Sequence, residues 1–132
     1  MIYLFPGLGS EYAGMAGRFA AEFPGTQSRL SEWFGPMRAQ RILAEDDMAV
    51  ETPDQELALQ QRVHALNLLW WRLAAASPAH APASGFAGHS LGFYAALVAA
   101  GSLSERASLQ VIETVPLGFK RAICLVRIHD QV

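Results

Sequence analysis

Cysteine, charged residues and long apolar runs are all scarce in this sequence. Cys124 is the single cysteine, so no disulfide can form within the chain, which is typical of a reducing compartment. Charged residues make up 17% against 52% hydrophobic ones, a composition that excludes disorder and fits a soluble globular protein. The net charge is −2 and no basic stripe is present, so nucleic acid is not an expected partner.

The lack of long apolar runs bears on the membrane and on targeting. Residues Met1–Phe5 are apolar, but they have no basic leader and meet Pro6-Gly7 at once, so they do not resemble a signal peptide. No run reaches the roughly 20 residues that span a bilayer. We therefore expect a cytoplasmic protein without a membrane partner. A chain of 132 residues is expected to form one domain at most.

The expected elements alternate as in an α/β protein. Apolar runs rich in strand formers, or bounded by turn residues, predict short strands at Ile2–Phe5, Gly85–Ala87 and Ile123–Ile128. Helical spacing of apolar residues predicts helices over Gly14–Phe23, Gln27–Phe34, Leu57–Ala76 and Ser90–Ala100. Gly35-Pro36 should stop the second helix, Ser77–Ser84 should form a loop, and Gly101 suits a left-handed helix end.

The longest predicted helix should bury one face. Its apolar residues recur at steps of three and four: Leu59, Val63, Leu66, Leu69, Trp70 and Leu73. We interpret Trp70-Trp71 as packing residues rather than a ligand cage. The acidic stretch Ala44–Glu56 is interpreted as a solvated loop, and Pro53-Asp54-Gln55-Glu56 as the start of this helix, where carboxylates favour the helix dipole.

The run Gly88-His89-Ser90-Leu91-Gly92 has the GxSxG spacing of a nucleophile elbow. A small-residue strand precedes it and an alanine-rich helix follows it, which is the setting that the elbow requires. The serine must sit in a tight turn, and side chains at 88 or 92 would collide with the neighbouring elements. The backbone N–H of Leu91 then lies at a helix N-terminus and can donate to an oxyanion. The alternative is that Ser90 only caps the helix.

The loop Phe5-Pro6-Gly7-Leu8-Gly9-Ser10 follows the first predicted strand. Its two glycines around Leu8 let the backbone approach a ligand closely. An oxyanion hole needs a second N–H from a loop beside the elbow, and Leu8 can supply it. A phosphate loop or a plain turn would have a similar composition, although no Gly-Lys-Ser/Thr follows as in a P-loop.

Together these two segments resemble the malonyl-CoA:acyl-carrier-protein transacylases. The first loop, with Gly14-Met15 after it, is similar to their FPGQGSQxxGM opening. The second segment, continuing through Phe93-Tyr94 to Ala100-Gly101, is similar to their GHSLGEYxALxxAG elbow. The resemblance covers roughly residues 1–113, which would be the N-terminal part of an acyltransferase domain, and residues 114–132 form a divergent tail.

The resemblance implies a fold and an activity. The fold would be a three-layer α/β hydrolase-like core, here truncated and lacking the family's small ferredoxin-like subdomain. The reaction would move an acyl group from malonyl-CoA or another acyl-CoA to the phosphopantetheine thiol of an acyl carrier protein, in fatty acid or polyketide biosynthesis. No bound cofactor and no metal are implied.

The resemblance also implies roles for individual residues. Ser90 would form the acyl-enzyme, and the N–H groups of Leu8 and Leu91 would form the oxyanion hole. Gln61, which lies 29 positions before Ser90, is similar to the glutamine of the family's QP motif that lines the active site. His89 would orient the elbow and would not act as the base.

Several positions depart from the family pattern. Leu8 replaces a glutamine, Phe93 a glutamate and Arg62 a proline. A gap-free count places Val115 where the family has the arginine that pairs with the malonyl carboxylate, so malonyl specificity loses its support. Arg106 and Arg121 are nearby in sequence, but no register brings either one in.

A general base for Ser90 is also missing. The family's histidine lies downstream in a GHxxxV-type context, and the four histidines here, His64, His80, His89 and His129, do not match it. The resemblance also implies a further helix after the elbow helix, which Pro116 should break. We therefore expect a truncated or frame-altered gene product. A serine thioesterase or esterase and an inactive fragment therefore stay open as alternatives, and a complementing chain or self-association as a partner.

Overall fold

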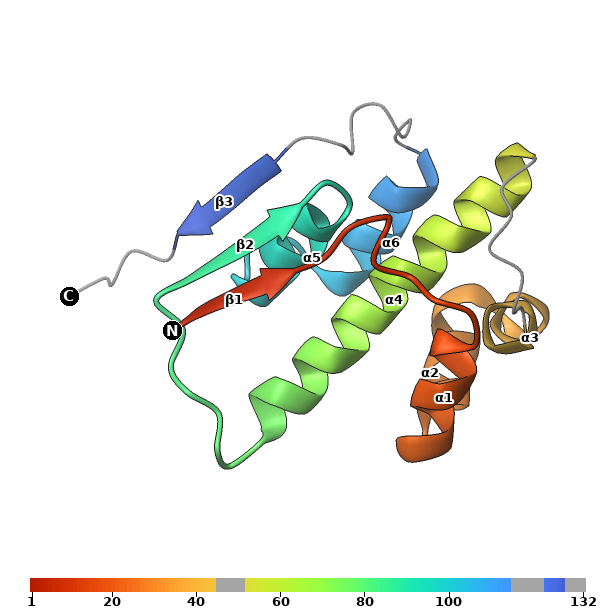
Figure 1. Ribbon diagram of the computed structural model, residues 1–132, viewed down its shortest axis with the longest axis horizontal. Coiled ribbons are helices and arrows are strands. Elements are labelled where there is room, and N and C mark those ends of the chain that lie inside the picture. Colours follow the sequence, from red (N-terminus) through yellow and green to blue (C-terminus); the bar gives the residue numbers. More distant parts are fainter. Residues whose placement is uncertain (45–51, 115–122, 128–132) are drawn as a thin grey trace.

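The computed structural model describes residues 1–44, 52–114 and 123–127. In chain order the elements are β1 (Ile2–Phe5), α1 (Met15–Glu22), α2 (Thr26–Phe34), α3 (Pro36–Ala44), α4 (Pro53–Ala76), β2 (Gly85–His89), α5 (Gly92–Ala99), α6 (Glu105–Thr114) and β3 (Ile123–Arg127) (Figure 1). Most of the expected acidic loop and the break at Pro116 lie outside the described residues. No helix in the described ranges is long and apolar enough to cross a membrane.

The three predicted strands form one sheet in the order β1-β2-β3. Strand β1 pairs in parallel with β2, so that Phe5 lies opposite Gly88. Strand β3 pairs antiparallel with the other edge of β2. The parallel pair brings the carboxyl ends of β1 and β2, and the loops that follow them, to the same edge of the sheet.

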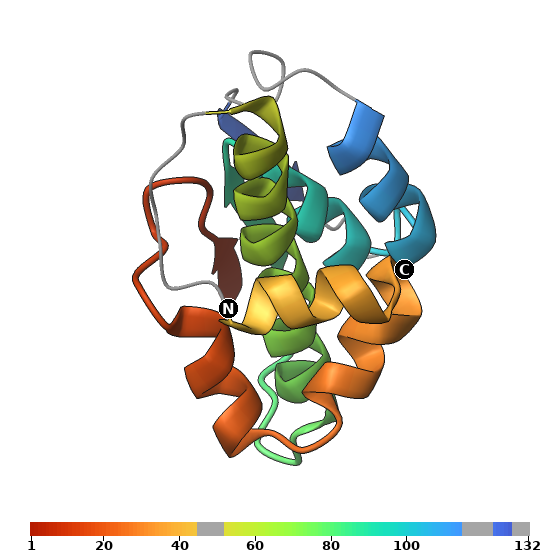
Figure 2. The same cartoon turned by 90° about the vertical axis from the view of Figure 1, so that its right-hand side faces the viewer.

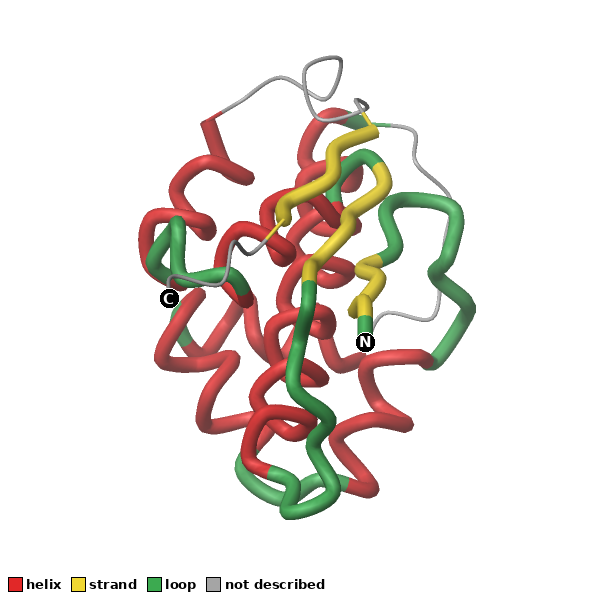
Figure 3. The backbone as a smooth tube through the Cα atoms, turned by 90° about the vertical axis from the view of Figure 1, so that its left-hand side faces the viewer, coloured by secondary structure: helices red, strands yellow, loops and turns green. Residues whose placement is uncertain are grey.

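Helices pack against one face of this sheet. On that face Phe5 and Phe86 are buried with Ala95 and Ala96 of α5. On the other face the β1 side chains of Ile2 and Leu4 are 57% and 75% exposed. Figure 3 shows the strands in front of the helices when the molecule is viewed from this side. Within the described residues, the second helical layer expected of a three-layer core is not seen over this face.

Helix α4 is the centre of the molecule, between α1–α3 on one side and α5, α6 and the sheet on the other (Figure 2). Thr52 and Gln55 form a capping box at its start, as the helix-start prediction requires. The prediction of a single buried face is wrong, because every residue from Ala58 to Leu69 is buried. Trp70 and Leu73, expected on the buried face, are 53% and 38% exposed.

Helix α3 is an element that sequence reasoning missed. Gly35-Pro36 ends α2 at Phe34 as predicted, but Pro36 is also the first residue of α3. Proline is well suited to a first helical position, where its missing N–H needs no partner. Gly35 makes the sharp turn between the two helices with a φ of +83°, a conformation that favours glycine.

Candidate active site

Ser90 lies between the end of β2 and the start of α5. Its φ is +55°, and within the described residues it alone among non-glycine residues has a positive φ. A left-handed backbone is costly for any side chain with a Cβ and persists only where the surroundings impose it. The predicted strained strand–turn–helix geometry is therefore present at this serine.

The alternative that Ser90 only caps the helix does not agree with the structure. The capping position of α5 is held by Leu91, and no side chain caps this helix. The Ser90 hydroxyl forms no hydrogen bond with any other residue of the described ranges. The serine is almost fully buried at 6% exposure. It is thus held in a strained turn without a structural bond that would explain it.

Glycine at positions 88 and 92 is required by the surrounding backbone. A Cβ at Gly88 would overlap the backbone of Gly92 and Phe93, which begins α5. A Cβ at Gly92 would overlap the carbonyl of Phe5 and lie 2.7 Å from that of Pro6. The two glycines therefore let β1, β2 and α5 meet closely around the serine, as the motif predicts.

The first loop packs directly on the elbow. A Cβ at Gly7 would overlap the carbonyl of His89 and lie 2.9 Å from the Ser90 Cβ and 3.2 Å from the Leu91 nitrogen. The N–H groups of Leu8 and Leu91 donate to no other described residue. Two free backbone donors next to a serine are the parts from which an oxyanion hole is made.

One side chain that sequence reasoning missed fastens this loop. Asn67 of α4 donates from Nδ2 to the Pro6 carbonyl oxygen over 2.9 Å, and it is 6% exposed. A polar residue within a buried helical run is the one signal that could have singled it out. Its partner could not be found that way, because the contact joins segments far apart in the sequence.

Gln61 is buried and accepts a hydrogen bond from Arg38 Nη1 of α3 over 2.6 Å. No hydrogen bond links it to the elbow within the described part of the chain. Gln60 lies about two helical turns before Asn67 and so on the helix face that carries Val63 and Asn67. Val63 packs with Leu91 and Leu8. The role of Gln61 as an acyl-site residue stays a prediction. Gln60, its neighbour, lies on the face of α4 that is directed toward the elbow.

None of the described histidines is hydrogen-bonded to Ser90. His64, expected at the surface or in packing, is fully buried, with Nε2 2.8 Å from Ser108 Oγ. Ser108 gives its own proton to the Glu105 carbonyl, so the imidazole Nε2 is the donor in this pair. His80 stacks on Tyr3 of β1. His89 is exposed at the end of β2, and His129 lies outside the described residues.

The departures from the family pattern have different surroundings. Leu8 packs on an apolar cluster that includes Val63 and Leu91. Arg62 is 3% exposed and donates from Nε to the Ile42 carbonyl, which fastens α4 to α3. Phe93 is half-buried beside Tyr94. Val115 and Arg121 lie outside the described residues.

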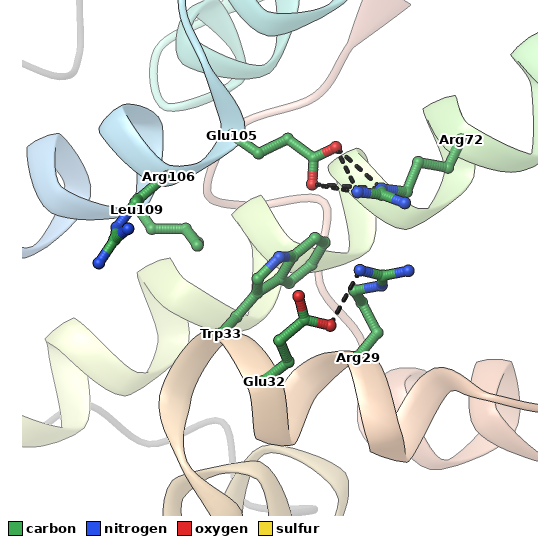
Figure 4. A pocket seen from close by; sticks show the side chains of 7 residues that line it. All are labelled: Arg29, Glu32, Trp33, Arg72, Glu105, Arg106 and Leu109. Carbon is green, nitrogen blue, oxygen red and sulfur yellow. Dashed lines mark hydrogen bonds and ion pairs between the residues drawn. The ribbon is translucent and has the colours of Figure 1, made fainter.

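A cavity of about 640 Å³ between α2, α4 and α6 lies away from the elbow, at the carboxyl end of α4. Figure 4 shows two pairs of oppositely charged side chains in this cavity: Arg72 pairs with Glu105, and Arg29 with Glu32. Arg72 also lies over the Trp33 ring, 5.9 Å from its centroid. Arg106, which no register places at the family's arginine position, lines this cavity.

A serine in a strained strand–turn–helix elbow, next to a glycine loop in a mixed α/β fold, is the arrangement of serine acyltransferases and hydrolases. Comparison with known proteins narrows this class. The chain is similar to the polyketide biosynthesis protein ThaF of Burkholderia thailandensis, with 34% identity over 115 residues that cover 84% of this chain and 9% of that protein. The chain matches no protein-family profile.

Solved structures agree with this relative. An acyl-carrier-protein S-malonyltransferase from Burkholderia pseudomallei matches with a TM-score of 0.63 and 29% identity, over 84% of this chain and 36% of that one. A malonyl transacylase crystallised with its type II polyketide acyl carrier protein matches with a TM-score of 0.58 and 29% identity, over 85% and 36% of the chains. The chain therefore has the fold of the malonyl-CoA:acyl-carrier-protein transacylases and spans about a third of those structures.

Proposed function

We propose that Ser90 is the nucleophile of an acyl transfer from an acyl-CoA to the phosphopantetheine thiol of an acyl carrier protein. The observation that carries this proposal is the left-handed backbone of Ser90 at the tip of the elbow, with no structural hydrogen bond to its hydroxyl. The fold shared with malonyl transacylases and the similarity to a polyketide biosynthesis protein support the same reaction. Fatty acid or polyketide biosynthesis is the proposed context.

In the first half of the reaction Ser90 Oγ attacks the thioester carbonyl of the acyl-CoA. The carbonyl oxygen becomes an oxyanion, which accepts hydrogen bonds from the N–H groups of Leu8 and Leu91. The N-terminus of α5 adds a favourable dipole to this site. The tetrahedral intermediate collapses, the bond from carbon to sulfur breaks, and CoA leaves as its thiol with the proton that Ser90 loses. The product is an ester on Ser90.

In the second half the phosphopantetheine thiol of the carrier protein attacks this ester. The same two N–H groups stabilise the second oxyanion, Ser90 regains its proton, and the acyl group leaves on the carrier as a thioester. The related malonyl transacylase that was crystallised with its acyl carrier protein supports a carrier of this kind.

A base must take the Ser90 proton in the first half. None of the described histidines is hydrogen-bonded to Ser90. We propose that the base comes from polypeptide outside the described residues, since the chain spans about a third of the structures it matches. His89 is proposed only to support the elbow, through the backbone carbonyl that contacts Gly7.

The acyl group is proposed to be uncharged or weakly polar. Leu8 and Phe93 stand where the family has polar side chains, and within the described ranges no arginine is hydrogen-bonded to the elbow residues 88–92. A free carboxylate is selected best by a bidentate guanidinium. The second candidate function is that of a serine thioesterase or esterase. The same apolar replacements favour it, because they suit an uncharged acyl group, which water could then remove from Ser90.

Labelled acyl-CoA separates these functions. The protein is incubated with radiolabelled acetyl-CoA and malonyl-CoA, and acyl carrier protein is then added. Label on the protein that moves to the carrier supports transfer, whereas label released into water supports hydrolysis. Absence of label, with Ser90→Ala indistinguishable from the natural sequence, would contradict both enzymatic functions.

A further inference from the structure

The proposed oxyanion-hole loop is held by a side chain that belongs to neither sequence motif. Asn67 donates from Nδ2 to the Pro6 carbonyl oxygen over 2.9 Å, from the middle of α4. We propose that Asn67 is a positioning residue that sets the direction of the Leu8 N–H through the Pro6–Gly7 peptide group. This inference rests on the proposed function of Ser90 and adds a residue to that site.

The bond acts on the one free torsion of Pro6. The proline ring fixes φ, so the orientation of the following peptide plane depends on ψ alone. The Pro6 carbonyl and the Gly7 N–H share this rigid plane, from which the chain continues to Leu8. Holding the Pro6 carbonyl from α4 therefore fixes the plane from which Gly7 continues, and the Gly7 torsions, with the Ser10 bond to the Gly7 carbonyl, carry this orientation to the Leu8 N–H.

The other hydrogen bonds of the loop are made within it, so the hydrogen-bonded anchor to α4 is left to Asn67. The Gly7 carbonyl is taken within the loop by Ser10, whose Oγ donates over 2.7 Å, and the Gly9 N–H donates to Glu11 Oε2. Among the described residues, Asn67 supplies the one hydrogen bond to residues 6–11 from outside that segment. Without it the loop would be held by its own hydrogen bonds and by van der Waals contacts with the elbow and with the apolar cluster around Val63.

The surroundings of Asn67 make it a stiff support. It is 6% exposed on a helix that is buried on all sides at this level, and residues on rigid elements place functional groups more precisely than loops do. On the outer side, Pro6 and Asn67 line a groove of about 270 Å³ together with Trp71. This groove gives the Pro6 carbonyl room to turn away when the amide donor is removed.

The kinetic test replaces the donor and keeps the size of the side chain. Asn67→Leu and Asn67→Asp both lack the N–H, and the carboxylate also repels the Pro6 carbonyl. We expect the rate constant of Ser90 acylation by acetyl-CoA to fall about 10- to 100-fold, the scale of a misplaced or lost oxyanion donor, with KM nearly unchanged. Ser108→Ala is the matched control, since it breaks another buried hydrogen bond of α4, one that involves no residue of this loop.

A second measurement does not depend on activity. In protein labelled with nitrogen-15 leucine, the Leu8 amide resonance of both Asn67 variants should shift and its order parameter should fall, whereas Ser108→Ala should leave both unchanged. A folded Asn67→Leu protein with an unchanged Leu8 amide, or one that acylates at the natural rate, would overturn the proposal. If the natural protein is not acylated but Leu8 still responds, the positioning role stands and the proposed function of Ser90 fails.

Discussion

Ser90 shows how a few glycines produce a reactive geometry. Its left-handed backbone is imposed by close contacts between the end of β2, the start of α5 and the first loop. Those contacts exist because Gly7, Gly88 and Gly92 have no side chain. The strain at Ser90 is therefore supported by packing at three separate points along the chain.

Adding one methyl group at Gly92 should test this packing. Gly92→Ala would drive a Cβ into the carbonyl of Phe5, so we expect the free energy of unfolding to fall by about 1–3 kcal/mol or more. Gly17→Ala is the control, because its Cβ would meet only the Leu43 carbonyl, at 3.2 Å, and alanine is favoured within a helix. Urea denaturation measures both, and an equal cost for the two variants would contradict the packing described.

The elbow and the first loop could be predicted from sequence because their geometry is local. Glycine spacing and the flanking elements predict each segment separately. That Leu8 lies beside Ser90 follows from the parallel pairing of β1 with β2, and the resemblance to the transacylases led us to expect it. The contacts of Asn67 and Gln61 could not be predicted, since each joins α4 to a segment that only the tertiary fold brings near.

At the scale of elements, α4 organises the molecule. Its burial on all sides follows from the helices α1–α3 on one side and α5 and α6 on the other (Figure 2). The spacing of apolar residues predicted this helix, but it cannot reveal that a second layer of helices covers the opposite face. Arg62 and His64 are polar, so from the sequence alone they indicate an exposed face although both are buried. Helix α3 was missed because Gly35-Pro36 was interpreted only as the end of α2, whereas Pro36 is also the first residue of the next helix.

The capping box at the start of α4 should contribute measurably to stability. The Gln55 N–H donates to Thr52 Oγ1, and Gln55 Oε1 accepts from the Thr52 N–H. Thr52→Ala should lower the free energy of unfolding by about 1 kcal/mol, the usual value of a lost N-cap. Thr114→Ala, in the last turn of α6, serves as a control and should cost less. Thermal unfolding with both variants decides between these values.

The ion pair between Arg72 and Glu105 joins α4 to α6 at the large cavity (Figure 4). Its bidentate geometry is favourable, but the two side chains are 42% and 27% exposed, so solvent screens the attraction. A double-mutant cycle with Arg72→Ala and Glu105→Ala should give a coupling of about 0.2–1 kcal/mol that weakens as salt is added. A coupling that does not change with salt would show that packing on Trp33 dominates.

At the scale of the whole molecule, the outer face of the sheet stands out. Ile2 and Leu4 are exposed there, and β1 is an edge strand within the described sheet (Figure 3). Exposed apolar edge strands promote association. We therefore expect the 132-residue chain to self-associate at micromolar concentrations and Leu4→Lys to reduce this, as measured by light scattering. A monodisperse monomer of the natural sequence would contradict the expectation.

The match to transacylase structures covers about 85% of this chain and about a third of those structures. Nucleophile and oxyanion donors need only the elbow and its neighbouring loop, which the described residues contain. None of the described histidines is hydrogen-bonded to Ser90, and the base is proposed to lie outside the described residues. The chain therefore holds one half of a proposed acyl-transfer site, and its reactivity depends on how well that half is formed.

Acylation of Ser90 can be observed directly by peptide mass mapping after incubation with acetyl-CoA and malonyl-CoA. We expect an acyl group on the peptide that contains Ser90, more from acetyl-CoA than from malonyl-CoA, and none in Ser90→Ala. An unmodified Ser90 under conditions in which the protein is folded, or an acyl group that persists in Ser90→Ala, would contradict the role of this serine as the nucleophile.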